Sequence, residues 1–259
     1  MQELDLDALR AAAGLEALAL QAVARCASTN AELLARPPRA RPFLLAAAEQ
    51  TAGRGRRGRR WYAEPGASIA FSLGCLLTRP LRELAPLTLV AGVATAEALR
   101  ALGAEALRLK WPNDLVVHGA KLGGILVETR AAAGGVYAVI GIGLNWRRSA
   151  TLAQRLRRRI AALEDCVAPL PSREAVIGAI ARALVPAVEA FDARGFGTWR
   201  SRWLALAEGL GARLRLRLAG GGTASGRFAG LEPDGALRLA TRAGERTYAV
   251  GNIVTARTA

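Results

Sequence analysis

The chain has 259 residues, of which 52% are hydrophobic and 22% are charged. This length excludes a short disulfide-stabilised peptide and suffices for one or two domains with a buried core. The 36 lysine and arginine residues outnumber the 21 aspartate and glutamate residues, and the formal net charge of +15 makes nucleic-acid binding one hypothesis.

Lysines are far rarer than arginines in this chain. Only Lys110 and Lys121 are lysines, and every other basic residue apart from His118 is an arginine. A general compositional preference for arginine explains the excess. A lysine in such a chain therefore indicates a position where arginine cannot replace it, because a compact ammonium and a planar guanidinium make different contacts.

Cysteine usage and the amino-terminal segment indicate the compartment. Cys26, Cys75 and Cys166 are far apart and form no C-x-x-C pair, which argues against a disulfide framework or a zinc module and favours buried, inert thiols in a reducing cytosol. The chain begins with acidic residues, and no apolar run approaches the roughly 18 to 20 residues of a membrane span. We therefore expect a cytoplasmic protein with no membrane partner.

Hydrophobic periodicity predicts a mixture of helices and strands up to about residue 208. A break at 26–30 contains Ser28, which is a candidate amino-terminal cap for a helix. The predicted elements are a helical stretch over 3–35 with that break, strands over 43–48 and 68–77, a helix over 86–102, short strands over 107–110 and 115–117, a hairpin of strands 125–129 and 136–142, and helices at about 151–163 and 172–195.

The pattern changes after residue 208. Arginine and leucine alternate strictly over 213–218, which places the leucines on one face of a strand and the arginines in water. Three glycine-containing turn signals follow at intervals typical of a small all-β unit. We predict an α+β domain over 1–208 and a small β domain over 209–259.

Residues 53–58 (GRGRRG) form a glycine–arginine loop after a predicted strand. They match the pattern G-x-G-x-x-G, but the following residues, 59–66, form no helix that could receive a pyrophosphate, so a Rossmann dinucleotide site is rejected. The loop either presents N–H and guanidinium groups to phosphate or carboxylate oxygens, or is a solvated basic loop without a ligand.

The two lysines lie close together in the sequence. Residues 110–114 (KWPND) connect two short strands, and Lys121 follows seven residues later. A turn with two surface lysines is one explanation, but two lysines so close in an arginine-rich chain favour a contact to an oxyanion. Residues 141–145 (GIGLN) end a strand with glycines that either permit close approach of a ligand or form a simple turn.

Several enzyme classes are excluded by missing motifs. The chain has no P-loop pattern, no G-x-S-x-G and no H-E-x-x-H. Its single histidine, His118, rules out a multi-histidine metal centre.

Together these segments resemble one known family. Residues 28–30 (STN), Gln50 with the glycine–arginine loop and Trp61, 110–114, 121–128 (KLGGILVE) and 141–145 resemble the biotin protein ligases in order and spacing, over about residues 25–259. The resemblance implies an α+β fold with a class II synthetase-like mixed sheet, flanking helices and a small carboxy-terminal SH3-like β-barrel. It also implies an ATP-dependent ligase that activates biotin as biotinyl-5′-AMP and transfers it to one lysine of a carrier protein.

The resemblance implies roles for individual residues. Lys121 and Arg56 are the implied catalytic residues. The implied biotin contacts are Ser28, Thr29, Asn30, Gln50, Arg54, Gly55, Arg56, Lys121, Gly124 and Gly143. The implied contacts to ATP and the adenylate are Arg54, Arg56, Arg57, Arg59, Trp61, Lys110, Asn113, Lys121 and Asn145, and Asp114 is implied as a Mg²⁺-linked residue.

The implied partners follow from the same resemblance. They are MgATP and biotin as substrates, no tightly bound cofactor, and the biotin carboxyl carrier protein of acetyl-CoA carboxylase or a related carboxylase. The segment before Ser28 is too short for the DNA-binding module of bifunctional members, so we expect a monofunctional ligase that does not bind DNA; a homodimer through sheet edges is compatible with the resemblance. The alternatives are a lipoate or octanoyl ligase or transferase and, in a different class, a nucleic-acid-binding protein.

Overall fold

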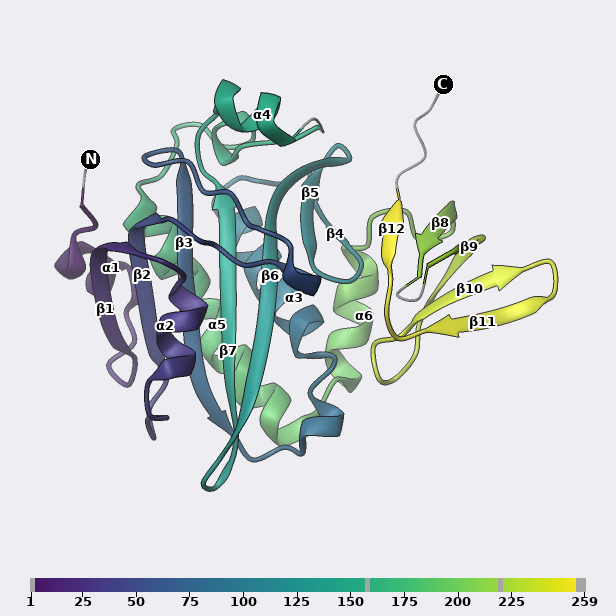
Figure 1. The fold of residues 1–259 in the computed structure, drawn as a ribbon, viewed down its shortest axis with the longest axis horizontal. Coiled ribbons are helices and arrows are strands. Elements are labelled where there is room, and N and C mark those ends of the chain that lie inside the picture. Colours follow the sequence, from purple (N-terminus) through teal and green to yellow (C-terminus); the bar gives the residue numbers. More distant parts are fainter. Residues whose placement is uncertain (1–2, 157–158, 219–220, 255–259) are drawn as a thin grey trace.

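The computed structural model describes residues 3–156, 159–218 and 221–254. Figure 1 shows a large sheet with helices and, beside it, a smaller sheet formed by the carboxy-terminal strands. The helices are α1 Leu6–Ala13, α2 Thr29–Ala35, η1 Arg56–Gly58, η2 Leu81–Glu83, α3 Leu87–Ala101, α4 Ala150–Leu156, η3 Leu163–Asp165, α5 Arg173–Arg194 and α6 Gly197–Ala205. The strands are β1 Ala19–Cys26, β2 Phe43–Gln50, β3 Ser68–Leu77, β4 Leu107–Lys110, β5 Asp114–Val117, β6 Ala120–Ala132, β7 Gly135–Asn145, β8 Arg213–Arg217, β9 Thr223–Leu231, β10 Leu237–Thr241, β11 Gly244–Tyr248 and β12 Asn252–Val254.

The large sheet is mixed, as predicted. Within the described residues it has seven strands in the order β1-β2-β3-β7-β6-β5-β4. The pair β1–β2 is parallel, and the remaining neighbours are antiparallel. Strand β7 is at its centre, and the nearly continuous burial of β2 and β3 indicates that both of their faces are covered.

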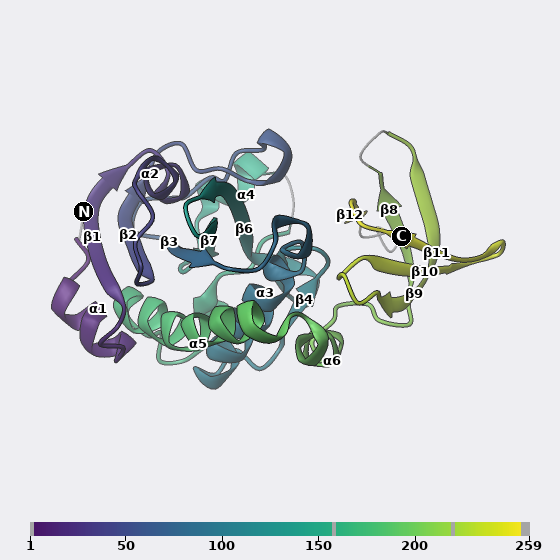
Figure 2. The ribbon, with the colours of Figure 1, turned by 90° about the horizontal axis from the view of Figure 1, so that it is seen from below.

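Helices cover the two faces of this sheet unequally. Viewed from below, α1, α3 and α5 lie on one face, whereas α2 and the glycine–arginine loop lie on the other (Figure 2). Helix α3 is buried along most of its length between the sheet and α5. No helix in the described ranges is long and apolar enough to cross a membrane.

The helical stretch predicted over 3–35, with its break at 26–30, was wrong over 19–26. Gly14 adopts a left-handed conformation, with φ 60°, and ends α1 after Ala13. Residues 19–26 then form β1, which pairs in parallel with β2. This segment is rich in good helix formers, and the hydrogen bonds offered by β2 override that local preference.

One further helix prediction needed correction and one helix was missed, whereas the hairpin was confirmed. The helix predicted over 151–163 ends at Leu156, and Ile160 instead forms a bridge with Lys121; residues 157–158 lie outside the described residues. Helix α6 was not predicted. The hairpin is confirmed in β6 and β7, and both strands are longer than predicted.

The smaller sheet shares its core with the large one. Its order, β11-β10-β9-β8-β12, is antiparallel throughout the described residues. The rings of Trp203 in α6 and Phe228 in β9 meet edge to face with centroids 6.2 Å apart, and the indole Nε1 of Trp111 donates to the carbonyl of Gly235 at 3.1 Å. The α+β class is confirmed, while the boundary between 1–208 and 209–259 and the SH3-like form of the smaller sheet stay predictions.

Candidate functional site

A cavity of about 520 Å³ lies between the large sheet, the start of α2 and the glycine–arginine loop. A volume of this order suits a small organic ligand. Most of the residues predicted from the sequence line it, although they come from distant segments: Ser28, Thr29, Asn30, Gln50, Arg54, Gly55, Arg56, Arg59, Trp61, Lys110, Asn113, Asp114, Lys121, Gly124 and Gly143.

One end of the cavity is buried and polar. Ser28 caps α2 and accepts a hydrogen bond from the backbone N–H of Ala31 at 3.4 Å. The backbone N–H of Thr29 donates to Oε1 of Gln50 at 2.9 Å, and the Thr29 hydroxyl lies 3.2 Å from the same oxygen. Ser28, Thr29 and Asn30 are each at most 4% exposed. Burial of such polar groups is unfavourable unless they are hydrogen-bonded, as these are.

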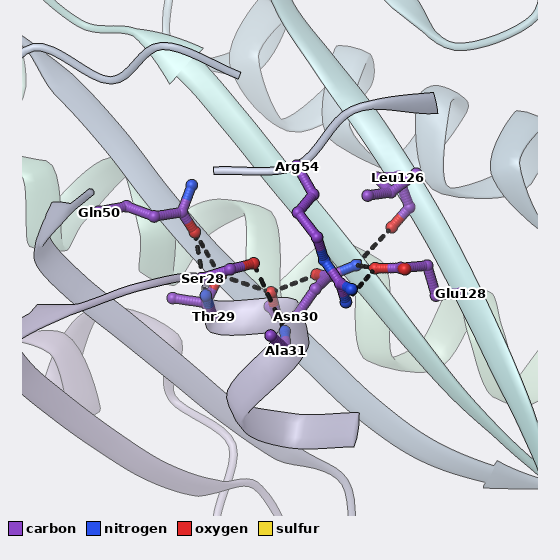
Figure 3. Close-up of polar contacts among 9 residues, drawn as sticks. Ser28, Thr29, Asn30, Ala31, Gln50, Arg54, Leu126 and Glu128 are labelled. Atoms are coloured by element: carbon purple, nitrogen blue, oxygen red, sulfur yellow. Dashed lines mark hydrogen bonds and ion pairs between the residues drawn. The ribbon is translucent and has the colours of Figure 1, made fainter. Parts of the chain in front are cut away.

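Asn30 occupies the centre of this polar end (Figure 3). The Ser72 hydroxyl donates to Asn30 Oδ1 at 2.6 Å. On the other side, Asn30 Nδ2 donates to the carbonyl of Leu126 at 3.2 Å and to Oε2 of Glu128 at 2.9 Å. Space for the amide exists because residue 141 is a glycine, whose Cβ would lie 2.2 Å from Asn30 Oδ1.

The middle of the cavity is apolar. Phe71 and Ile142 are buried in the sheet beneath it. The indole of Trp61 lies over Gly143, where an added Cβ would come within 2.5 Å of Trp61 Cε2. The glycines of 141–145 therefore permit close approach, to the amide of Asn30 and to the ring of Trp61.

The other end of the cavity is cationic. Lys121 forms an ion pair with Asp114, and its Nζ lies 5.7 Å from the centroid of the Trp61 ring. A Cβ at Gly124 would lie 3.2 Å from that Nζ, so the glycine leaves room for the ammonium. Lys110, Arg56 and Arg59 also line the cavity, whereas Arg54 reaches the side of Asn30, where it pairs with Glu128.

Two buried hydrogen-bond donors beside the cationic end of the cavity lack acceptors among the described residues. Arg56 Nη1 and Trp61 Nε1 are both buried, and neither has a hydrogen-bond partner among the described residues. Burial, followed by repulsion from Arg57, lowers the pKa of the Arg56 guanidinium. An arginine stays charged in proteins, so this wall favours a ligand that carries anionic oxygens.

Two predicted contacts lie outside this cavity. Arg57 is exposed and lines a neighbouring hollow on the other side of the loop. Asn145 is buried, and its Nδ2 donates to the carbonyls of Lys121 at 3.2 Å and Ala161 at 2.9 Å. Asn145 thus holds the backbone of Lys121, and a direct contact of either residue with a ligand stays a prediction.

No group of three or more histidine, cysteine, aspartate or glutamate side chains that could hold a metal ion occurs in the described part of the chain. Asp114 is the one acidic residue among those that line the cavity. A Mg²⁺ ion that arrives with substrate phosphates needs only one or two carboxylates.

Comparisons with known proteins identify the family. Residues 24–145 match the biotin/lipoate A/B protein ligase family, and residues 209–254 match the biotin protein ligase C-terminal domain. The biotin–acetyl-CoA-carboxylase ligase of Paracoccus denitrificans is 34% identical over 240 residues, which cover 89% of this chain and 98% of that protein. The chain belongs to the biotin protein ligases.

Other members of the biotin protein ligases agree with this assignment. The bifunctional ligase/repressor BirA of Escherichia coli is 35% identical over 214 residues, which cover 82% of this chain but 66% of that protein, slightly less than two thirds of its length. The structure of the biotin protein ligase of Aquifex aeolicus in complex with biotin and ATP superposes with a TM-score of 0.77 at 24% identity, covering 93% of this chain and 98% of that chain. The two chains share one fold.

Several residues of the site were not predicted. Ser72 is a hydroxyl in an otherwise apolar, buried strand, and Glu128 is an acid within a long central strand. A polar residue at such a position signals a specific hydrogen bond. Neither of these two residues lines the cavity itself, whereas Asn252 and Ile253 of β12 do, and the packing of the smaller sheet brings them there.

Proposed function

We propose that this chain is an ATP-dependent ligase that joins biotin to a lysine of an acceptor protein. In the first step, a carboxylate oxygen of biotin attacks the α-phosphorus of ATP, the bond to the bridging oxygen breaks, and pyrophosphate leaves. In the second step, the amine of the acceptor lysine attacks the acyl carbon of biotinyl-5′-AMP. AMP leaves, the amine loses its proton, and an amide bond remains.

The division of the cavity into a polar end and a cationic end carries this proposal. Biotin has a ureido head with N–H and C=O groups, an apolar chain and a carboxylate, and these match the polar end, the apolar middle and the cationic end in order. Lipoate and octanoate, the substrates of the alternative, end in a disulfide ring or a methyl group. Such a tail would offer no N–H or C=O group to the buried polar side chains of Thr29, Asn30 and Gln50, which is unfavourable.

The cationic end suits the charge changes of the first step. A carboxylate and a phosphate repel each other, so cations must neutralise both before the oxygen can reach the phosphorus. We assign this role to Lys121 and Arg56, with Arg54 and Arg59 on the loop that closes over the ligands. A closed loop excludes water, which would otherwise hydrolyse the mixed anhydride.

Mg²⁺ belongs to this proposal as part of the MgATP substrate, with no tightly bound cofactor. Asp114 and Asn113 lie at the cationic end, and their side-chain oxygens are of the type that binds Mg²⁺. The proposed acceptor is a biotin carboxyl carrier protein in the cytoplasm. A homodimer and an SH3-like barrel in the smaller sheet complete the proposal.

Incubation of the purified protein with MgATP and an apo-carrier protein tests this function. Biotin, lipoate and octanoate are supplied in separate reactions, and the carrier is weighed by mass spectrometry. We expect one biotinyl group on the carrier and no acyl group in the other two reactions. Modification by lipoate or octanoate would favour the alternative, and no modification together with salt-sensitive binding to DNA would favour the nucleic-acid-binding class.

A further inference from the structure

Glu128 stands apart from the ligand cavity yet contacts two residues that line it. Its side chain is 27% exposed and lies on β6, where it borders a second hollow of about 670 Å³ on the far side of the glycine–arginine loop. Its Oε2 accepts from Asn30 Nδ2 at 2.9 Å and from Arg54 Nη2 at 3.0 Å (Figure 3). One carboxylate oxygen thus joins the polar end of the cavity to the loop.

The contact with Asn30 determines which way its amide points. A side-chain amide can rotate by a half turn and exchange its donor and its acceptor. The carboxylate of Glu128 and the carbonyl of Leu126 are acceptors only, so the Asn30 NH₂ group must face them. The Asn30 oxygen therefore faces the hydroxyl of the buried Ser72, and it can accept a second hydrogen bond, from an N–H group of a ligand in the cavity that Asn30 lines.

The contact with Arg54 fixes the loop. The loop contains several arginines that repel one another, and among the described residues the pair with Glu128 is the one ion pair that they form. Arg54 is 42% exposed, so an ion pair of this kind is weak unless hydrogen bonds support it. Here the shared oxygen supplies that support, because it is already held by Asn30.

We infer that Glu128 is a positioning residue that couples recognition of the ligand head by Asn30 to the placement of the loop through Arg54. The inference rests on the proposed function, since it concerns how biotin is held in the same site. Glu128 does not line the ligand cavity, so it acts through its two partners.

The substitution Glu128→Gln tests this coupling. A glutamine has the same size but offers its own NH₂ group, so the Asn30 amide can turn around, and the charge that holds Arg54 is lost. Biotin affinity is measured by titration calorimetry. We expect about tenfold weaker binding, the scale of a lost hydrogen bond to a charged group. The matched control is Glu97→Gln, which removes a carboxylate from the exposed Glu97–Arg202 ion pair away from the cavity and should leave affinity unchanged.

A double substitution separates positioning from a general structural effect. If Glu128 acts through Asn30, Glu128→Gln combined with Asn30→Ala should weaken biotin binding by less than the product of the two single effects. Limited trypsin digestion without ligand reports on the loop, and cleavage within residues 53–60 should be several-fold faster in Glu128→Gln than in the parent chain or in Glu97→Gln. All variants should unfold at similar temperatures.

Two results would overturn the inference. One is an unchanged biotin affinity together with an unchanged rate of loop cleavage in Glu128→Gln. The other is a double variant whose biotin affinity falls by the full product of the two single effects of Glu128→Gln and Asn30→Ala. If the parent chain itself binds no biotin, the proposed function fails instead. The digestion experiment then still decides whether Glu128 holds the loop.

Discussion

Lys121 lies in a confined, charged environment. Its ammonium contacts Asp114, approaches the face of Trp61, and lies beside Gly124, where a Cβ would come within 3.2 Å of it. The side chain is 17% exposed, so water screens the charge only partly. This environment explains why a lysine persists here in an arginine-rich chain.

Replacing Lys121 by alanine should slow formation of the adenylate by about a hundredfold, the scale for loss of one group that stabilises an oxyanion. Release of pyrophosphate in the presence of ATP and biotin measures this step. Lys121→Arg should recover only part of the rate, because the guanidinium is wider than the ammonium. An unchanged rate in Lys121→Ala would remove the residue from the chemical step.

The environment of Gly143 leaves no room for a larger side chain unless Trp61 moves. A Cβ in Gly143→Ala would lie 2.5 Å from the Trp61 ring, so the indole must move out of the cavity wall. We expect biotin affinity to fall about tenfold, equivalent to about 1.4 kcal/mol. Gly197→Ala is the control, because its Cβ would meet no atom within 4 Å. Equal affinities in both variants would show that Trp61 does not shape the site.

The three thiols should be unreactive in the folded chain. Burial raises the pKa of Cys75 to about 12 and that of Cys26 to about 11, and it also raises the pKa of Cys166. Because these pKa values lie above pH 8, the thiols stay protonated there, and the nucleophilic thiolate is scarce. Alkylation by iodoacetamide at pH 8 should be slow until denaturant is added. Rapid modification of the folded chain would contradict this expectation.

At the scale of elements, the cap of α2 serves both stability and the site. Ser28 and Ser172 are the amino-terminal caps of α2 and α5, and each accepts from the backbone N–H three residues later. Replacing either serine by alanine should lower the free energy of unfolding by about 1 kcal/mol. Biotin affinity should fall only in Ser28→Ala. Urea titration and calorimetry measure the two effects, and a loss of affinity in Ser172→Ala would contradict the assignment.

The elements that pattern alone predicts well are those with long apolar runs or clear turn signals. The strand over 68–77 and the helix near 86–102 were predicted from apolar runs, and the hairpin was predicted from the glycines of its turn. Strand β1 was missed because its residues favour a helix in isolation. Only its partner β2, which follows a separate helix, makes the extended form favourable.

The residues of the candidate site that could be predicted from the sequence are those that are unusual in this composition. The glycines, the two lysines and the arginine loop are conspicuous in this composition, and the structure brings them around one cavity. Ser72 and Glu128 were missed because their importance depends on register. They matter because β3 and β6 place them beside Asn30, and no local pattern reveals that contact.

At the scale of the whole molecule, the two sheets share one buried core. Phe228 is 1% exposed and packs on Trp203, and the indole of Trp111 is bonded to the turn before β10. Phe228→Ala should lower the free energy of unfolding by about 3–5 kcal/mol. Tryptophan fluorescence and far-ultraviolet circular dichroism should report a single shared transition. Two separate transitions would show that the sheets fold independently.

The net charge of +15 does not require a nucleic acid as partner. In the proposed ligase, the arginines within residues 54–60 neutralise the negative charges of ATP and of the biotin carboxylate. The positive field also favours the approach of these anions, so the apparent affinity for ATP should decline as salt rises.

Exchange of labelled pyrophosphate into ATP isolates formation of the biotin adenylate, because it requires the ligand acid, its adenylate and no acceptor protein. We expect exchange when biotin is supplied, and none with octanoate or lipoate. Exchange driven by octanoate or lipoate, or no exchange with any of the three acids, would contradict the proposed function.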